Sequence, residues 1–204
     1  MARPTHNSQP RGGTVWLTGL PGAGKSTIAA VLAERLTADG RDVEVLDGDE
    51  VRPHLSPELG FSRQDRDRNV KRIGFVASLL ASHGVTVVVP VIAPYCDARA
   101  AVRRQHEKHA VAYLEVHVTT PVAVCAKRDV KGLFARHRRG ELIGLTGVDD
   151  PYEAPVDPDL CIDAYGQSVA ESVDKLYRFL VRCGLAGPMR PGSSFCDQPS
   201  GTAL

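Results

Sequence analysis

The chain has 204 residues, 43% of them hydrophobic and 24% charged, and its formal net charge is +1 at pH 7. This length suits one domain with extensions. The balanced charge is compatible with a soluble enzyme and does not indicate a nucleic-acid partner or a membrane partner. No stretch approaches the ~18 apolar residues of a membrane-spanning helix, and the N-terminus has no apolar signal core. The five cysteines form no CxxC pair, which favours reduced thiols over a disulfide framework or a zinc site. We therefore expect a cytoplasmic protein.

Five apolar runs alternate with helical patterns along the chain. The runs read as strands, several apolar enough to be buried on both faces, at 14–20, 42–47, 85–93, 112–118 and 160–164. Helices are predicted at 25–39, 63–82, 97–108, 121–128 and 168–183. This alternation predicts an α/β fold with a doubly wound, mostly parallel five-stranded sheet. Residues 1–13 and 187–204 lack periodicity and are rich in Pro, Gly and Ser, so we expect disordered ends around a domain of residues 14–186.

The segment WLTGLPGAGKSTIAAVLAERL carries a glycine-rich turn between the first strand and the first helix. It fills every fixed position of GxxxxGK followed by Ser or Thr, the phosphate-binding P-loop signature. In such a loop backbone N–H groups surround phosphate oxygens, the lysine reaches the outer phosphates and the hydroxyl after it holds Mg²⁺. We therefore expect a nucleoside triphosphate to bind here, through Gly19, Leu20, Pro21, Gly22, Ala23, Gly24, Lys25, Ser26 and Thr27.

Two carboxylates follow the second strand in LDGDEVR, and ligands gather at strand carboxyl ends in folds of this class. Asp47 and Asp49 flank a glycine, so one could orient hydrated Mg²⁺ and the other could accept a proton. Asp-Gly-Asp alone is also an ordinary turn. The P-loop upstream favours the functional interpretation.

The next helix is predicted to begin at Ser62, with Asp65 three residues on as in a capping box. Arg66 and Asn69 share one face near its start and could both reach a ligand, while Phe61 offers a flat surface for a base. For the other basic side chains of this segment, Arg63, Arg68 and Lys71, we expect a solvated surface.

Residues 129–155 combine the basic run KGLFARHRR with the glycines of IGLTG and show no apolar period. This composition is consistent with a lid that closes over phosphates and excludes water. A merely solvated basic loop is the alternative.

The segments GLPGAGKST, LDGDEVR, LGFSRQDRDRNVKRIG, VIAPY, RDVKGLF and LTGVDDPYEAP, in this order and spacing, resemble the adenylylsulfate kinase family over about residues 14 to 183. Members of that family use ATP to phosphorylate the 3′-hydroxyl of adenosine 5′-phosphosulfate (APS), giving 3′-phosphoadenylylsulfate for sulfate assimilation. The resemblance implies a P-loop kinase fold with a mobile lid, ATP and APS as substrates, Mg²⁺ as cofactor and a homodimer. No sulfurylase domain is present in the sequence, so we expect a separate sulfurylase to supply APS.

The resemblance also implies roles for single residues. Arg128 matches an arginine that packs on the ATP base, and Lys131, at the start of the lid, matches a lysine that reaches the acceptor. Asp49 is implied as base or orienting group, with Lys25 as the second catalytic residue, and Ser26 and Asp47 as the metal site. The acceptor-binding residues implied are Asp47, Asp49, Arg52, Phe61, Arg66, Asn69, Ile92, Ala93, Lys131 and Leu145.

Several positions depart from the family pattern: Glu50, Arg68, Ala93, Cys96 and Leu145. Leu145 matters most, because a phenylalanine there would sandwich the acceptor adenine against Phe61. A leucine loses aromatic stacking worth roughly 1 kcal/mol. We therefore expect weaker APS binding or an acceptor related to APS.

Two other functions remain open on the sequence. One is a kinase of the same family that acts on another hydroxylated acceptor. The other is a non-catalytic nucleotide-binding module, against which the intact Lys25, Ser26, Asp47 and Asp49 argue.

Overall fold

The computed structural model describes residues 12–187 of the protein. The sequence-based predictions of disordered ends at 1–13 and 187–204 therefore lie almost entirely outside the described residues, although the first strand already begins at Gly13. Within residues 12–187 no helix has both the length and the apolar character needed to cross a membrane.

Five strands form a single parallel sheet, which confirms the predicted fold class. Their order is β2-β3-β1-β4-β5, with β1 between β3 and β4 at its centre. Every neighbouring pair is parallel, because each strand is followed by a helical crossover. The strands are β1 (Gly13–Thr18), β2 (Val43–Val45), β3 (Thr86–Pro90), β4 (Ala112–Thr119) and β5 (Leu160–Asp163).

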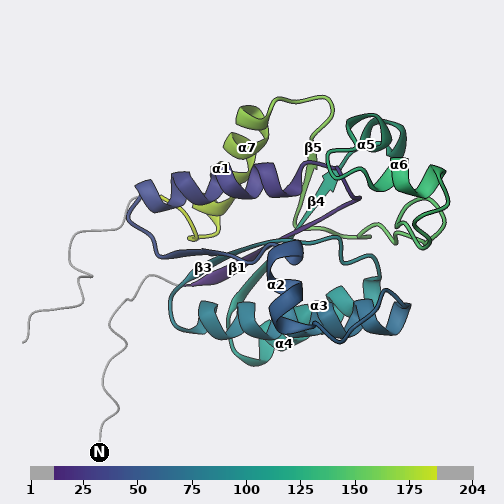
Figure 1. Cartoon of the computed structure of the whole chain (residues 1–204). Coiled ribbons are helices and arrows are strands. Elements are labelled where there is room, and N and C mark those ends of the chain that lie inside the picture. Colours follow the sequence, from purple (N-terminus) through teal and green to yellow (C-terminus); the bar gives the residue numbers. More distant parts are fainter. Residues whose placement is uncertain (1–11, 188–204) are drawn as a thin grey trace, which may run out of the picture.

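Helices cover both faces of the sheet (Figure 1). One layer contains α1 (Lys25–Ala38), α5 (Val122–Arg128), α6 (Leu133–Arg138) and α7 (Val169–Arg182). The other layer contains α2 (Gly48–Leu55), α3 (Arg63–Ser82) and α4 (Cys96–Lys108). Two cores result, one on each side of the sheet, as expected for a doubly wound fold.

Alternate residues of the central strand belong to different cores. In β1 the side chains of Val15 and Leu17 pack against α1 and α7, whereas Trp16 packs against α3 and α4. All three are fully buried. A strand buried on both faces reads as a continuous apolar run, which is why the sequence predicted β1 well.

Two helices were not predicted from the sequence, α2 and α6. The carboxylate of Asp47 caps α2 by accepting a hydrogen bond from the backbone N–H of Asp49 at 2.9 Å, so the Asp-Gly-Asp segment is a helix start and not a free turn. In the same way Asp129 accepts from the backbone N–H groups of Phe134, at 3.0 Å, and Ala135, at 2.8 Å, at the start of α6. Phe134, within the predicted lid of residues 129–155, is buried in the core, a packing that the sequence pattern did not indicate.

Candidate active site

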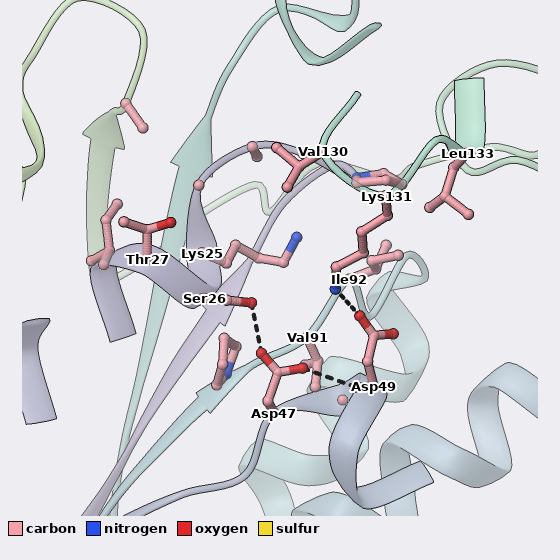
Figure 2. A pocket seen from close by; sticks show the side chains of 18 of the residues that line it. Lys25, Ser26, Thr27, Asp47, Asp49, Val91, Ile92, Val130, Lys131 and Leu133 are labelled. Atoms are coloured by element: carbon pink, nitrogen blue, oxygen red, sulfur yellow. Dashed lines mark hydrogen bonds and ion pairs between the residues drawn. The ribbon is translucent and has the colours of Figure 1, made fainter. Parts of the chain in front are cut away.

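A cavity of about 570 Å³ opens at the carboxyl ends of the strands. Its lining includes the P-loop after β1, Asp47 after β2 and Ile92 after β3 (Figure 2). Loops that follow adjacent parallel strands meet at one edge of the sheet, so the fold itself brings these segments together. The lining also contains Arg128, the last residue of α5, and Lys131, which follows α5.

The P-loop has the backbone that its glycines predict. Gly22 and Gly24 have φ of 75° and 106°, in the left-handed region that glycine adopts without strain. The Lys25 ammonium is buried and donates to the carbonyls of Gly19, at 2.9 Å, and Leu20, at 2.8 Å. Burial lowers the pKa of Lys25 to about 8. The loop therefore holds a cation at the cavity, ready for an anionic ligand.

Ser26 and Asp47 provide oxygen ligands of the kind that Mg²⁺ prefers. The Ser26 hydroxyl donates to Asp47 Oδ2 at 2.6 Å, so both groups lie together beside the P-loop (Figure 2). No group of three or more His, Cys, Asp or Glu side chains that could hold a metal occurs within residues 12–187. One hydroxyl and one carboxylate beside a phosphate site fit Mg²⁺, which usually keeps several waters and phosphate oxygens as its other ligands.

Asp49 projects from the first turn of α2 toward the segment after α5. Its carboxylate forms an ion pair with Lys131 (Figure 2). This hydrogen bond to Asp49 raises the pKa of Lys131. Both side chains are more than half exposed, at 71% for Asp49 and 56% for Lys131, so the pair faces the cavity and remains accessible.

The cavity lining also contains Phe61, Arg52 and Asn69. The Phe61 ring is 66% exposed, and the Arg52 guanidinium lies over it with 4.4 Å to the ring centroid. Asn69 is 7% exposed, and its buried Oδ1 has no hydrogen-bond partner among the described residues. An unpartnered buried amide oxygen at a cavity is a candidate ligand contact, because leaving it unpaired is costly.

Arg66 lines the cavity, and its guanidinium also contacts the segment that returns from α6. It donates to the carbonyl of Gly144 at 2.6 Å and to the hydroxyl of Thr146 at 2.9 Å, in addition to the carbonyl of Phe61 at 2.8 Å. The carboxylate of Asp150 lies 3.8 Å from its Nε. Arg66 therefore links α3 to residues 144–150, a contact that helical spacing did not predict.

The turn after β3, residues 91–95, forms hydrogen bonds with Thr18 of β1 and with residues 150–153. The Thr18 hydroxyl donates to the Ile92 carbonyl at 2.5 Å. The Tyr95 hydroxyl donates to Asp150 at 3.1 Å, and the backbone N–H of Glu153 donates to the carbonyl of Pro94 at 2.8 Å. Asp150 and Glu153 belong to the sequence motif TGVDDPYE, and their hydrogen bonds to the turn show what these two residues of the motif contact.

The predicted site residues separate into a large set within the cavity and a small set outside it. Arg128 lies in the lining and donates to the carbonyl of Ala164 at 2.9 Å. Gly19 and Leu20 lie outside the lining and contribute their carbonyls to Lys25. Leu145 is 4% exposed, packs in the core that contains Phe134, and does not line the cavity. Its predicted role beside the acceptor stays a prediction. The predicted site residues that line the cavity are Pro21, Gly22, Ala23, Gly24, Lys25, Ser26, Thr27, Asp47, Asp49, Arg52, Phe61, Arg66, Asn69, Ile92, Ala93, Arg128 and Lys131.

Known proteins with similar sequences include adenylyl-sulfate kinases, and several similar solved structures are APS kinases. A family model described as adenylylsulphate kinase matches residues 11–163. A probable adenylyl-sulfate kinase of Synechocystis sp. is 51% identical over 174 residues, which are 85% of this chain and 96% of that protein. The structure of an APS kinase from Mycobacterium tuberculosis in complex with AMPPNP and APS superposes with a TM-score of 0.82 at 42% identity, covering 84% of this chain and 99% of that one.

A hexameric APS kinase from Thiobacillus denitrificans superposes with a TM-score of 0.69 at 39% identity and covers 89% of this chain and 31% of that one. The family model spans most of the chain, and the Synechocystis relative is matched over nearly its full length. Both the P-loop and the Asp-Gly-Asp segment, which lie together in the cavity, fall inside the matched residues. The chain therefore belongs to the adenylylsulfate kinase family.

Proposed function

We propose that this protein is an ATP-dependent adenylylsulfate kinase, which transfers the γ-phosphoryl group of ATP to the 3′-hydroxyl of APS. The products are ADP and 3′-phosphoadenylylsulfate. The observation that carries this proposal is that a single cavity is lined both by the P-loop and by Phe61, Arg66 and Asn69, with Asp49 in the same lining. The relative from Mycobacterium tuberculosis, solved with AMPPNP and APS, supports both substrates.

The transfer is a direct displacement in this proposal. The 3′-oxygen of the acceptor forms a bond to the γ-phosphorus as the bond to the β-γ bridging oxygen breaks, and ADP leaves. The Asp49 carboxylate receives the hydroxyl proton. Ala93, on the turn after β3, has no hydroxyl that could carry a phosphoryl group, so no phosphoenzyme forms there.

The side chains around the phosphates have distinct tasks. Lys25 neutralises charge on the outer phosphates, and Ser26 with Asp47 would hold Mg²⁺. When bound, Mg²⁺ supplies charge neutralisation and orientation of the phosphate oxygens. Lys131 holds Asp49 on the acceptor side of the cavity through their ion pair. Arg128 packs on the ATP base.

Residues 129–155 act as a lid in this proposal, within a kinase domain of residues 14–186. The lid contains α6, and Val130, a lid residue before α6 that is 82% exposed, lines the cavity. The hexameric relative from Thiobacillus denitrificans supports an oligomer, for which we propose a homodimer. A separate sulfurylase supplies APS, and the protein acts in the cytoplasm.

A coupled assay with ATP, Mg²⁺ and APS tests the function. We expect stoichiometric formation of ADP and 3′-phosphoadenylylsulfate. If the protein turned over another hydroxylated nucleotide or a small metabolite but not APS, that compound would be the acceptor in place of APS. ATP binding without turnover of any acceptor would indicate a nucleotide-binding module.

A further inference from the structure

Arg99 is a buried arginine that does not line the cavity but forms a hydrogen bond with the backbone of Ala93, which does. It lies in the first turn of α4, its exposure is 3%, and it is not among the residues that line the cavity. Its guanidinium donates to the Ala93 carbonyl and to the Glu153 carbonyl, each at 2.7 Å. The same group donates to Glu115 Oε1 at 2.7 Å. One side chain therefore joins the turn after β3, the C-terminal end of the lid and strand β4.

Ala93 has a backbone conformation that needs support. Its φ is 43°, in the left-handed region that is unfavourable for a residue with a Cβ atom. Such a residue persists only where its surroundings hold it, and strained residues of this kind gather at functional sites. Ala93 lines the cavity beside Ile92, and its carbonyl accepts from Arg99. This hydrogen bond holds the carbonyl of the strained residue, and the side chain that donates it lies outside the cavity lining.

The guanidinium is itself fixed by a charged network on the sheet. Glu115, in β4, is 9% exposed and pairs with Arg99 at 2.7 Å and with Arg103 at 3.7 Å. Arg103 in turn pairs with Asp159 at 2.7 Å. Desolvation cancels much of the Coulombic gain of a buried ion pair, so stability alone does not explain why the pair is present. Holding the Arg99 guanidinium in a fixed position is another explanation.

The second carbonyl contact of Arg99 reaches the C-terminal end of the lid, residues 150–155. Glu153 also donates its backbone N–H to the Pro94 carbonyl at 2.8 Å, and its carboxylate accepts from the Cys96 N–H at 2.8 Å. Three residues earlier, Asp150 accepts from Tyr95 at 3.1 Å. The turn and the segment thus form one unit, with Arg99 bonded to both halves.

We propose that Arg99 is a positioning residue for acceptor binding, which sets the shape of the Ile92–Ala93 wall by holding the carbonyls of Ala93 and Glu153. The proposal rests on the proposed function for the identity of the acceptor. None of the hydrogen bonds of Arg99 within the described residues goes to the P-loop, so we expect it to act on the acceptor side.

The Arg99→Lys variant distinguishes a positioning role of Arg99 from a contribution to protein stability alone. Lysine keeps the charge beside Glu115 but lacks the planar fork that reaches two carbonyls and a carboxylate at once. Because small displacements of substrate-positioning groups cost up to about 100-fold in rate, we expect KM for APS to rise roughly 10-fold or more. We expect the dissociation constant for ATP to stay within about twofold of the unmodified protein's, as the P-loop is not part of the unit.

Arg103→Lys is the matched control, because it makes the same change in the same network at a residue that contacts neither carbonyl. It should leave KM for APS within about twofold. Glu115→Gln provides a second test if Arg99→Lys fails to fold. Its amide keeps the shape but removes the charge that anchors Arg99, and KM for APS should rise in the same direction by a smaller factor.

The outcomes are distinct. An unmodified protein that does not turn over APS refutes the proposed function and not the role of Arg99. An unmodified protein that turns over APS, with KM for APS unchanged in both Arg99→Lys and Glu115→Gln, overturns the proposal. A parallel loss of ATP and APS affinity in the folded variants also overturns it, because that result indicates a structural role only.

Discussion

Lys131 and Asp49 form an ion pair although 82 positions separate them in the chain. Asp49 lies in the first turn of α2, and Lys131 lies between α5 and α6, at the start of the lid. The pair brings a lid residue into direct contact with the carboxylate that we assign as base. The position of the lid and the position of the base are therefore linked through one contact.

Asp49→Asn should lower the rate of phosphoryl transfer to APS by on the order of 10²- to 10⁴-fold, because the amide cannot accept the hydroxyl proton. The dissociation constant for ATP should be nearly unchanged, since Asp49 lies on the acceptor side. Single-turnover kinetics and a separate ATP titration measure the two quantities. Glu50→Gln, the same kind of change at the next residue, is the control and should keep the rate. A near-normal rate for Asp49→Asn would remove the proposed base.

Lys25→Ala should abolish phosphoryl transfer while the protein still folds. The reason is that Lys25 supplies the cation of the P-loop, whereas its buried ammonium adds little to stability. Activity assays with circular dichroism and thermal unfolding check both parts. Lys175→Ala, on α7 away from the cavity, is the control. A folded Lys25→Ala variant with full activity would contradict the assignment of the P-loop.

The lowered pKa of Lys25, about 8 against 10.5, predicts a pH dependence of stability. Between these values the unfolded chain binds a proton that the folded protein does not, so stability rises with pH, by on the order of 3 kcal/mol across the window. Below pH 8 both states are protonated and the contribution is constant. Urea unfolding from pH 7 to 10.5 measures this slope, and Lys25→Met should remove it.

ATP binding should take up a proton near pH 8.5, because the triphosphate favours the charged form of Lys25 and raises its pKa. ATP affinity should accordingly fall as pH increases above about 8. Calorimetry in buffers of different ionisation enthalpy measures the uptake. Equal uptake in the unmodified protein and in Lys25→Met would assign the proton to another group.

Arg66→Ala should lower kcat/KM for APS and leave ATP affinity unchanged. The guanidinium faces the cavity and holds Gly144 and Thr146 of the lid, so both the anionic substrate and the lid lose a contact. A charge-assisted pair of this type contributes about 1.5 to 3 kcal/mol, which corresponds to roughly 10- to 150-fold. Arg68→Ala, an exposed arginine of the same helix, is the control. APS turnover that is insensitive to Arg66→Ala would argue decisively against this acceptor site.

The stereochemical course at phosphorus should be inversion, because one in-line displacement exchanges the two apical oxygens once. ATP with a chiral γ-phosphate, followed by analysis of the product, measures it. Retention would indicate two displacements through some other residue of the protein, since Ala93 offers no nucleophile.

The sequence alone determined the sheet, the P-loop and most of the helices. These features depend on local signals, such as the apolar run of β1, the helical spacing of Ile28, Leu32 and Leu36, and the left-handed glycines of the P-loop. Ser62 capped the helix at Arg63–Ser82 as its position before Asp65 predicted. The pattern D-x-x-E at Asp47 and Glu50 was a signal for α2 that the sequence interpretation did not use.

Only the tertiary structure decided which partners the charged side chains take. Arg99 and Arg103 look equivalent in the sequence, and the predicted ligand contact of Arg66 did not include its contact with residues 144–150. The sequence shows where a long side chain lies along a helix but not which groups it contacts. In the fold Arg66 binds the lid, Arg99 binds two backbone carbonyls and Arg103 binds Asp159. Leu145 likewise lies in a core that is assembled from distant segments. These contacts join residues far apart in the chain, so no local pattern encodes them, and packing alone selects them.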